Sequence, residues 1–442
     1  MSNPSAVLPV DAAMLRILWC DNANLIRGKA VRVDTLPASD DDPPFVTISE
    51  AMQALPVMKD APVLSTGLGP IGAIDLAADL SSLVRLPYTR GHWSAMGDMT
   101  KRGEPWACCP RAFLKRMVAQ AQEAGLEIHA AFENEFYLLN GLNTLEPSDH
   151  TNFAAALAMN INEAMIDDFI DTLGEQGVTV EQYYPESGPG QQEVTVRYNT
   201  ALRACDQQVI FRETARAIAR SHGLIASFLP KVFADSTGNG CHLHLSLWRD
   251  DVNILPDRQA THGLSSAARH FIAGILHHLP ALMAITTPTV NSYRRIEPSG
   301  WSGAFQCWGV ENKEAAVRAI LDRGHKIRHF ELKTIDATSN PYLALGAVIA
   351  AGLDGIRREL ELDKPVQVDP GQLSNQDREA LGIEPLPTQL QDALTHLKRD
   401  GAIIASLGKE LARAYLGVKK AENEALEAMT LDQERELLLE KY

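Results

Sequence analysis

Four short segments alternate polar side chains with hydrophobic ones, at the two-residue spacing of a β-strand. Side chains two residues apart on a strand point to the same side, so each segment would have one polar and one hydrophobic face. The polar faces carry Glu133 and Glu135 in AFENEFY, Glu193 in EVTVRY, His242, His244 and Ser246 in CHLHLSL, and His329, Glu331 and Lys333 in HFELK.

The choice of these polar groups indicates a possible metal site. Two carboxylates about 7 Å apart on one strand face repel each other unless a cation lies between them. Several carboxylates with one imidazole suit Mg²⁺ or Mn²⁺ and differ from a tetrahedral zinc site. The alternative is an antiparallel sheet with one solvated face, which predicts the same alternation. Spacing alone leaves both interpretations open.

The surrounding sequence predicts the elements that position these strands. In PRAFLKRMVAQAQEAG an apolar stripe recurs at helical spacing, and Gly125 is a natural helix end. A strand follows in IHAAFENEFYLL, and other strands are predicted near 193–198, 241–248, 314–320 and 329–333. Further helices are predicted over 154–176, 200–222, 263–285, 340–358, 388–398 and 402–428. The Pro- and Gly-rich segment 363–387 is typical of a long surface loop.

The composition indicates a globular protein of more than one domain. A chain of 442 residues exceeds a single ordinary core, and residues up to about 100 suggest a small β-rich unit. We therefore predict an α+β protein with domains over 1–103 and 104–442. The net charge of −15, without a run of Lys or Arg, argues against a nucleic-acid partner.

Targeting and redox signals favour the cytoplasm. The six cysteines show no CxxC spacing, which argues against a zinc ribbon and favours free thiols in a reducing compartment. The first residues lack the basic region of a signal peptide. Two apolar stretches, FIAGILHHLPALMAI and NPYLALGAVIAAGLDGI, are better interpreted as buried helices than as membrane spans.

The segment GLGPIG, residues 67–72, matches the dinucleotide-binding pattern G-x-G-x-x-G. No amphipathic helix follows it, and no acidic residue closes a βαβ unit at the expected distance. We therefore interpret it as a loop.

Five motifs in fixed order resemble those of the glutamine synthetase family. They are FENEFY, ESGPGQQEVTVRY, FLPKVFADSTGNGCHLHLSL, NSYRRIEPSGWSGAFQCWG and HFELKTIDATSNPYLALGAVIAAGLDGI. The resemblance runs from about residue 100 to the C-terminus. It implies a small β-grasp-like N-terminal domain and a larger catalytic domain with an antiparallel sheet and flanking helices. It also implies stacked rings, usually dodecamers, with active sites between neighbouring subunits.

The resemblance assigns roles to individual residues. One metal would be held by Glu135, Glu186 and Glu193, and the other by Glu133, His242 and Glu331. Of the ATP contacts, His244 would touch phosphate, Ser246 would lie near adenine, and Arg318 would steady the transferring phosphoryl group. Lys313 stands where the family usually has an arginine. The expected chemistry is attack of a substrate carboxylate on ATP, followed by attack of an amine on the acyl phosphate.

The residues that the resemblance assigns to glutamate binding are only partly those of the family. Arg295 matches the family arginine for the substrate carboxylate, and Gly238 remains where the backbone meets the amino acid. Lys333 replaces a second arginine, so a bidentate fork becomes a point charge. Thr237 replaces the usual asparagine.

The residues at the positions of the family's ammonium site differ more from the family pattern. Trp301 stands where ammonia-using members carry a flap glutamate, six residues after Arg295. Asp79 matches one ammonium-site aspartate, but the loop LSTGLGPIG lacks the aspartate of the family's DGSS motif. An indole offers apolar area and a cation-attracting face where ammonium needs compact negative charge. The alternative for Trp301 is packing or a subunit contact.

These observations favour a ligase that joins glutamate to an organic amine, such as a polyamine, an alkylamine, an ethanolamine or an aromatic amine. Two alternatives stay open: a true glutamine synthetase, and a non-catalytic protein that keeps the fold for assembly or sensing. Burial of unpaired carboxylates without function is costly, which argues against the second.

Overall fold

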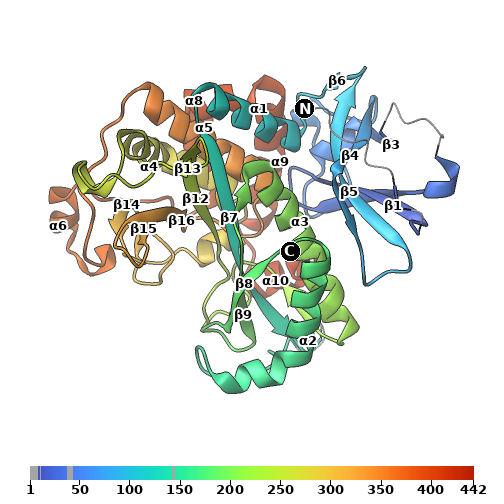
Figure 1. The fold of residues 1–442 in the computed structure, drawn as a ribbon, viewed down its shortest axis with the longest axis horizontal. Coiled ribbons are helices and arrows are strands. Elements are labelled where there is room, and N and C mark those ends of the chain that lie inside the picture. Colours follow the sequence, from blue (N-terminus) through green and yellow to red (C-terminus); the bar gives the residue numbers. More distant parts are fainter. Residues whose placement is uncertain (1–7, 10, 37–42, 142–144) are drawn as a thin grey trace.

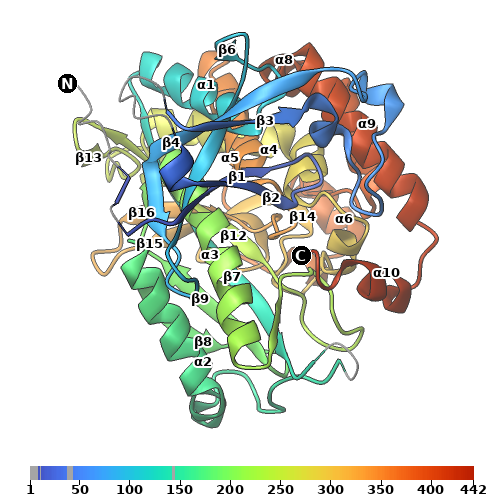
Figure 2. The ribbon, with the colours of Figure 1, turned by 90° about the vertical axis from the view of Figure 1, so that its right-hand side faces the viewer.

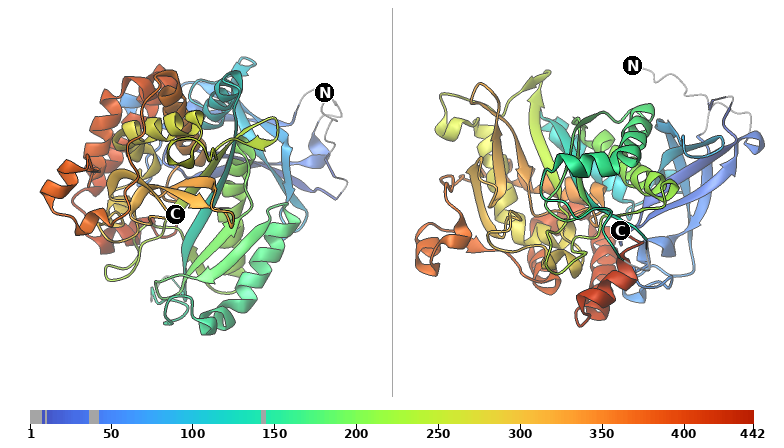
Figure 3. Two further views of the ribbon diagram at one scale, coloured as in Figure 1. Left: turned by 60° about the vertical axis from the view of Figure 1, so that its left-hand side comes forward. Right: turned by 90° about the horizontal axis from the view of Figure 1, so that it is seen from below.

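The protein folds into an α+β structure, as predicted, with a small N-terminal sheet beside a larger sheet and its helices (Figure 1). The computed structural model describes residues 8–9, 11–36, 43–141 and 145–442. Figure 2 turns the small sheet toward the viewer, and Figure 3 shows the C-terminal helices and α2 on opposite sides of the molecule.

The first sheet has strand order β2-β1-β5-β4-β3, with β6 paired to β5. Strands β1 and β5 run parallel and the other pairs antiparallel. Its hydrophobic residues, including Leu15, Ile17 and Leu76, form a separate small core. The strands are β1 Met14–Cys20, β2 Ile26–Arg32, β3 Phe45–Ser49, β4 Ala73–Arg85, β5 His92–Lys101 and β6 Glu104–Pro105.

The second sheet has strand order β17-β14-β15-β16-β12-β7-β9-β8, with β10 and β11 paired to β7 and β13 paired to β12. Its strands are β7 Glu127–Leu139, β8 Val180–Pro185, β9 Gln191–Val196, β10 Asn199–Thr200, β11 Ile225–Ser227, β12 Cys241–Arg249, β13 Val252–Asn253, β14 Phe305–Val310, β15 Ala315–Leu321, β16 Ile327–Leu332 and β17 Glu384–Pro385. The antiparallel expectation holds for the central strands, but β14 and β15 are parallel. The connection 311–314 returns the chain along β14, so that Ala315 pairs with Phe305.

The helices cover one face of this second sheet. They are α1 Pro110–Glu123, α2 Ala156–Glu175, α3 Ala201–Ser221, α4 Ser266–Thr286, α5 Pro341–Arg357, α6 Asn375–Ala380, α7 Leu390–Arg399, α8 Gly401–Leu407, α9 Lys409–Leu426 and α10 Leu431–Leu438. Helices α1 and α3 pack against β7, and Phe132, Phe136, Leu243 and Phe330 point into the shared core. The hydrophobic faces predicted for β7, β12 and β16 are therefore buried under helices, and their polar faces lie on the other side, whereas Tyr198 after β9, predicted on a hydrophobic face, is exposed and lies beside Trp248.

The predicted helices are present, with two differences in detail. The single helix expected over 402–428 is divided at Gly408, whose φ of +82° and ψ of 158° are a non-helical backbone conformation that favours glycine and ends α8 before α9 begins. The expected long loop over 363–387 contains the short helix α6, which begins because Ser374 accepts a hydrogen bond from the Asp377 N–H.

The other loop and membrane predictions can be compared directly with the structure. GLGPIG is a loop that runs into β4 rather than into a helix. The two apolar stretches lie in α4 and α5, which pack against each other with most of their residues buried. Among the residues that the structure describes, no helix is long and apolar enough to cross a membrane.

Candidate active site

The polar groups of the second sheet meet because its strand register places them opposite one another. His242 on β12 pairs with Glu133 on β7, and His244 pairs with Glu331 on β16. Arg318 on β15 is in turn directly opposite Glu331. Directly paired residues on one sheet face have neighbouring side chains. Four strands thus bring together the group that we call the patch: Glu133, His242, His244, Arg318 and Glu331.

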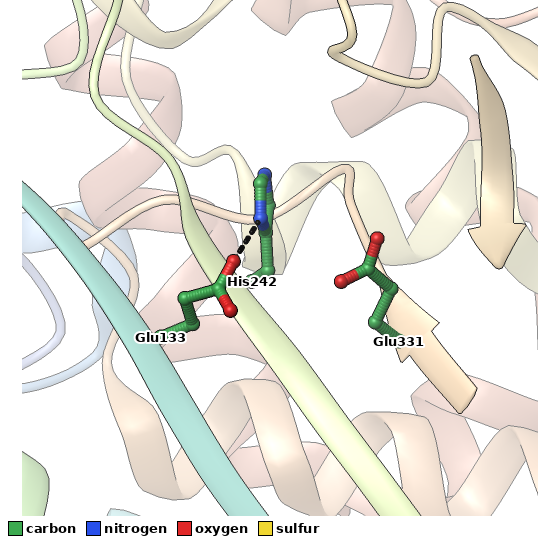
Figure 4. Close-up of side chains that lie close together, drawn as sticks. All are labelled: Glu133, His242 and Glu331. Atoms are coloured by element: carbon green, nitrogen blue, oxygen red, sulfur yellow. Dashed lines mark hydrogen bonds and ion pairs between the residues drawn. The ribbon is translucent and has the colours of Figure 1, made fainter. Parts of the chain in front are cut away.

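The first predicted ligand set is assembled in this patch. His242 Nδ1 lies 3.0 Å from Glu133 Oε1, and ligand atoms of Glu133, His242 and Glu331 all lie within 4.8 Å of one another (Figure 4). Glu331 is fully buried, and its Oε1 makes no aligned hydrogen bond although Arg318 Nε is 2.8 Å away. Two carboxylates and an imidazole with a poorly satisfied oxygen fit a divalent cation.

Charge in the patch is arranged as a metal ligand set requires. Burial, together with Lys333, lowers the pKa of His242 to about 4, so its imidazole is neutral and able to bind a metal. Burial alone would raise the pKa of Glu331, but Lys333, His244 and Arg318 lower it to about 2. Both ligand types are therefore held in their metal-binding protonation states.

His244 differs from its neighbour on the same strand. Its Nε2 lies 3.3 Å from Glu133 Oε2 and 3.2 Å from Glu331 Oε2. Burial opposes its charge, but the Glu133 carboxylate raises the pKa of His244 above its usual range. The two carboxylates thus favour the charged form of this imidazole, and a charged imidazole is suited to contact with a phosphate oxygen.

The ligand atoms of the second predicted set are less closely grouped. Glu135 on β7 pairs with Glu193 on β9, and Glu135 Oε2 accepts a hydrogen bond of 2.8 Å from the Gly240 N–H. Burial raises the pKa of Glu135 to about 7, helped by Glu186, and that of Glu193 to about 9. Neighbouring buried carboxylates have raised pKa values when no cation lies between them to offset their repulsion. In the described part of the chain, only the first set has all its ligand atoms within 4.8 Å.

A groove of about 790 Å³ adjoins the patch. It is lined by Glu133, His244, Ser246 and His329, so two of the three predicted nucleotide-contacting residues share one surface with a predicted metal ligand, whereas Arg318 does not line the groove. The far end holds an aromatic group that sequence reasoning missed: His129 stacks on Trp248 at 4.8 Å between ring centroids, and Tyr198 lies beside both. Both His129 and Trp248 continue the two-residue alternation of their strands, and that signal could have found them.

The predicted amino-acid end is built around Arg295. Its Nη2 donates to the carbonyl oxygens of Lys333 at 3.2 Å and Ile335 at 3.0 Å. Gly238 lies so close that an added Cβ would be 2.5 Å from Arg295 Cγ and 2.5 Å from the Pro230 carbonyl oxygen. Lys333 Nζ is 3.5 Å from both Glu331 Oε1 and His242 Nε2, which joins this end to the ligand patch.

Trp301 lies in the loop 296–304, which we name the flap. Its side chain is 50% exposed, its φ is +55°, and its backbone N–H donates to Glu314 Oε1 at 3.0 Å. Lys313 Nζ lies 4.2 Å from the centre of the indole ring. A left-handed conformation is unusual for a bulky residue, so the Glu314 hydrogen bond and Lys313 hold Trp301 in place. Sequence reasoning missed Glu314.

Asp79 is the predicted site residue that the single chain does not bring to the patch. It lies on β4 of the first sheet, where its Oδ2 is 2.8 Å from Arg111 Nη2. Arg111 also pairs with Asp98 and Asp206. This ion network links the first sheet to α1 and α3.

Fold and site together define a carboxylate-rich candidate cation site on the polar face of a large sheet, with a groove beside it. Residues 107–438 match the family described as glutamine synthetase, catalytic domain. The chain belongs to the glutamine synthetase family, and it is accordingly an ATP-dependent ligase that forms a C–N bond to glutamate.

Two relatives illustrate the range of the family. The chain is 33% identical to type-1 glutamine synthetase 1 of Dictyostelium discoideum, over 97% of this chain and 89% of that protein. It is 37% identical to the gamma-glutamylpolyamine synthetase GlnA3 of Streptomyces coelicolor, over 82% of this chain and 80% of that protein.

Solved structures resemble the whole chain. A crystal structure of a novel glutamine synthase homolog superposes with a TM-score of 0.84 at 31% identity, covering 99% of this chain and 100% of the other. A complex of GmaS with ADP superposes with a TM-score of 0.83 at 28% identity, covering 97% of each chain.

Proposed function

We propose that this protein joins the γ-carboxylate of glutamate to an organic amine, through a γ-glutamyl phosphate intermediate. The observation that carries the proposal is Trp301 on the flap, half-exposed and held by Glu314 and Lys313. An indole at this position favours an amine with a carbon body over ammonium. The gamma-glutamylpolyamine synthetase among its relatives supports the same branch.

The residues of the patch would divide the work. Glu133, His242 and Glu331 would hold one divalent cation, and Glu135, Glu186 and Glu193 a second, with Mg²⁺ or Mn²⁺ the expected ions. When bound, such ions neutralise phosphate charge on ATP. His244, Ser246 and Arg318 would orient the nucleotide, and Lys313, whose Nζ lies 4.2 Å from the centre of the Trp301 ring, would help to hold the flap.

The glutamate would lie at the other end of the patch. Arg295 and Lys333 would bind its carboxylate groups, beside the backbone of Gly238. The closed flap, with Trp301, would exclude water, because water would hydrolyse the acyl phosphate before the amine attacks.

We further propose domains over 1–103 and 104–442, a cytoplasmic location and a homo-oligomer of stacked rings. In the described structure, β6 extends the first sheet to Pro105. All six cysteines are free and buried, which supports a reducing compartment. Asp79, remote from the patch of its own chain, would then act in a neighbouring subunit.

ADP release with Mg²⁺, ATP and glutamate across a panel of amines tests this function. We expect an organic amine to give a higher kcat/KM than ammonium. Trp301→Glu should shift the preference toward ammonium, because it restores compact negative charge to the flap. Ammonium as the best substrate of the wild type would favour a true glutamine synthetase, and no turnover with any amine would favour a non-catalytic protein.

A further inference from the structure

One buried carboxylate of the flap region has no role in the proposed function. Glu314 is only 8% exposed, and it precedes β15, where it continues the two-residue alternation through Ala316 to Arg318. Val317 pairs with the core residue Leu332, whereas Arg318 pairs with Glu331 on the polar face. Glu314 therefore shares the catalytic face of the sheet with Arg318.

The flap crosses this face directly beside Glu314. A Cβ added to Gly303 would lie 2.8 Å from Ala316 Cα and 3.3 Å from Lys333 Cβ, so the flap backbone rests on these two residues. Trp301, two residues before Gly303, donates its backbone N–H to Glu314 Oε1 at 3.0 Å, so the flap contacts this carboxylate as well. An amine that enters beneath the flap would meet this carboxylate.

Only one of the two carboxylate oxygens of Glu314 accepts a hydrogen bond from the described residues. Oε1 accepts the Trp301 N–H, and Oε2 makes no hydrogen bond within the described residues. The nearby Asp369 differs, because its oxygens accept from the Gly371 N–H and the Ser299 hydroxyl. Glu297, also on the flap, is exposed to solvent. Glu314 is thus the buried carboxylate of this region with an oxygen available to a ligand.

Positive charge around the indole limits what else can bind there. Lys313 Nζ lies 4.2 Å from the centre of the Trp301 ring, and Lys333 and Arg318 lie further into the patch. A second ammonium group on the substrate would meet Lys313 at the ring face. Like charges placed this close repel each other.

We propose that Glu314 binds the ammonium head of a primary monoamine whose remaining body is uncharged and packs against Trp301. This inference rests on the proposed function and names its amine class. The free Glu314 oxygen accepts one proton from the R–NH₃⁺ group. The resulting R–NH₂ attacks the acyl carbon, the C–N bond forms, and the C–O bond to phosphate breaks with its electron pair on phosphate. The second proton leaves the nitrogen for the departing phosphate.

The test compares three nucleophiles in wild type, Glu314→Gln and Glu311→Gln with Mg²⁺, ATP and glutamate. Hydroxylamine is largely uncharged at neutral pH and needs no carboxylate, whereas butylamine carries one charge and 1,4-diaminobutane carries two. Glutamine keeps an oxygen for the Trp301 N–H, so Glu314→Gln removes the charge and leaves the flap held. Glu311 is an exposed glutamate of the same connection that accepts the Leu321 N–H, which makes it a matched control.

We expect Glu314→Gln to lower kcat/KM for butylamine by about tenfold or more, as loss of a charge-assisted hydrogen bond implies. Its rate of hydroxamate formation should stay within about twofold of wild type, and Glu311→Gln should change neither. Wild type should prefer butylamine to 1,4-diaminobutane. Three results would overturn the role of Glu314 and leave the proposed function intact. They are an equal loss of butylamide and hydroxamate formation in Glu314→Gln, no loss of either, and a wild-type preference for the diamine. Absence of hydroxamate from wild type would instead overturn the proposed function.

Discussion

Gly238→Ala should damage the glutamate end of the site without touching the nucleotide groove. The new Cβ would lie 2.5 Å from Arg295 Cγ and 2.5 Å from the Pro230 carbonyl oxygen, at least 0.5 Å inside the 3.0 Å below which an atom must shift. Relief of both contacts requires the Arg295 side chain to move and the backbone at residue 238 or 230 to shift. The Arg295 bonds of 3.2 and 3.0 Å to the Lys333 and Ile335 carbonyls would lengthen or break.

The expected loss of stability is about 1–3 kcal/mol, the range for an overpacked interior. Arg295 would also present its guanidinium to glutamate from the wrong position. We expect the KM for glutamate to rise about tenfold, which corresponds to about 1.4 kcal/mol, with the KM for ATP nearly unchanged. Steady-state kinetics with each substrate varied in turn, and urea unfolding, measure the two effects.

Gly174→Ala is the matched control, because an added Cβ there has no atom within 4 Å and lies within α2. It should raise the free energy of unfolding by about 0.5–1 kcal/mol, as alanine does in a helix interior, and leave both KM values unchanged. A Gly238→Ala protein with wild-type stability and wild-type glutamate KM would refute the argued contact between Gly238 and Arg295.

Two buried groups give pH-dependent predictions. The pKa of Glu193, about 9 when folded and ordinarily 4.5, means that the folded metal-free protein retains a proton which the unfolded chain loses, so stability falls as pH rises through this window. Glu193→Gln should therefore raise the melting temperature more at about pH 8.5 than at about pH 6 in chelator, and an equal gain would contradict this. His278 Nδ1 and Nε2 lie 2.6 Å from Asp400 and 3.0 Å from Asp354, which raise the His278 pKa against the opposing effect of burial, while it lowers theirs. The cluster of His278, Asp354 and Asp400 therefore stabilises the fold most between the ordinary aspartate pKa of 3.8 and the ordinary histidine pKa of 6.5. His278→Gln should lower the melting temperature more at about pH 6 than at about pH 9. An equal decrease at both pH values would argue against a charged histidine.

Alternation along single strands was sufficient to predict which faces of the sheet are polar. It placed Glu133 with Glu135, and His242 with His244, because the strand period fixes the side on which a residue lies. It could not predict the neighbours across strands, since register depends on the whole sheet. That His244 lies between Glu133 and Glu331 emerges only from the pairing of β12 with both β7 and β16.

Features that depend on turns and tertiary contacts were beyond sequence reasoning. Glu314 meets Trp301 because the connection 311–314 brings the chain back along β14, and no local pattern encodes that return. Asp79 gave no sign in the sequence of its ion pair with Arg111, which lies on α1. The parallel pairing of β14 with β15 is another long-range outcome of the same connection.

Direct binding of Mn²⁺, followed by the electron paramagnetic resonance of the free ion, tests the central claim. The convergence of Glu133, His242 and Glu331 predicts about one or more tightly bound Mn²⁺ ions per chain. The Mn²⁺ affinity should be much lower in Glu133→Gln and His242→Gln. Glu127→Gln, on the same strand but paired with His129, should bind as wild type does. Wild-type protein that leaves Mn²⁺ free, or a Glu133→Gln protein that binds it equally well, would contradict the claim that these strands build a metal site.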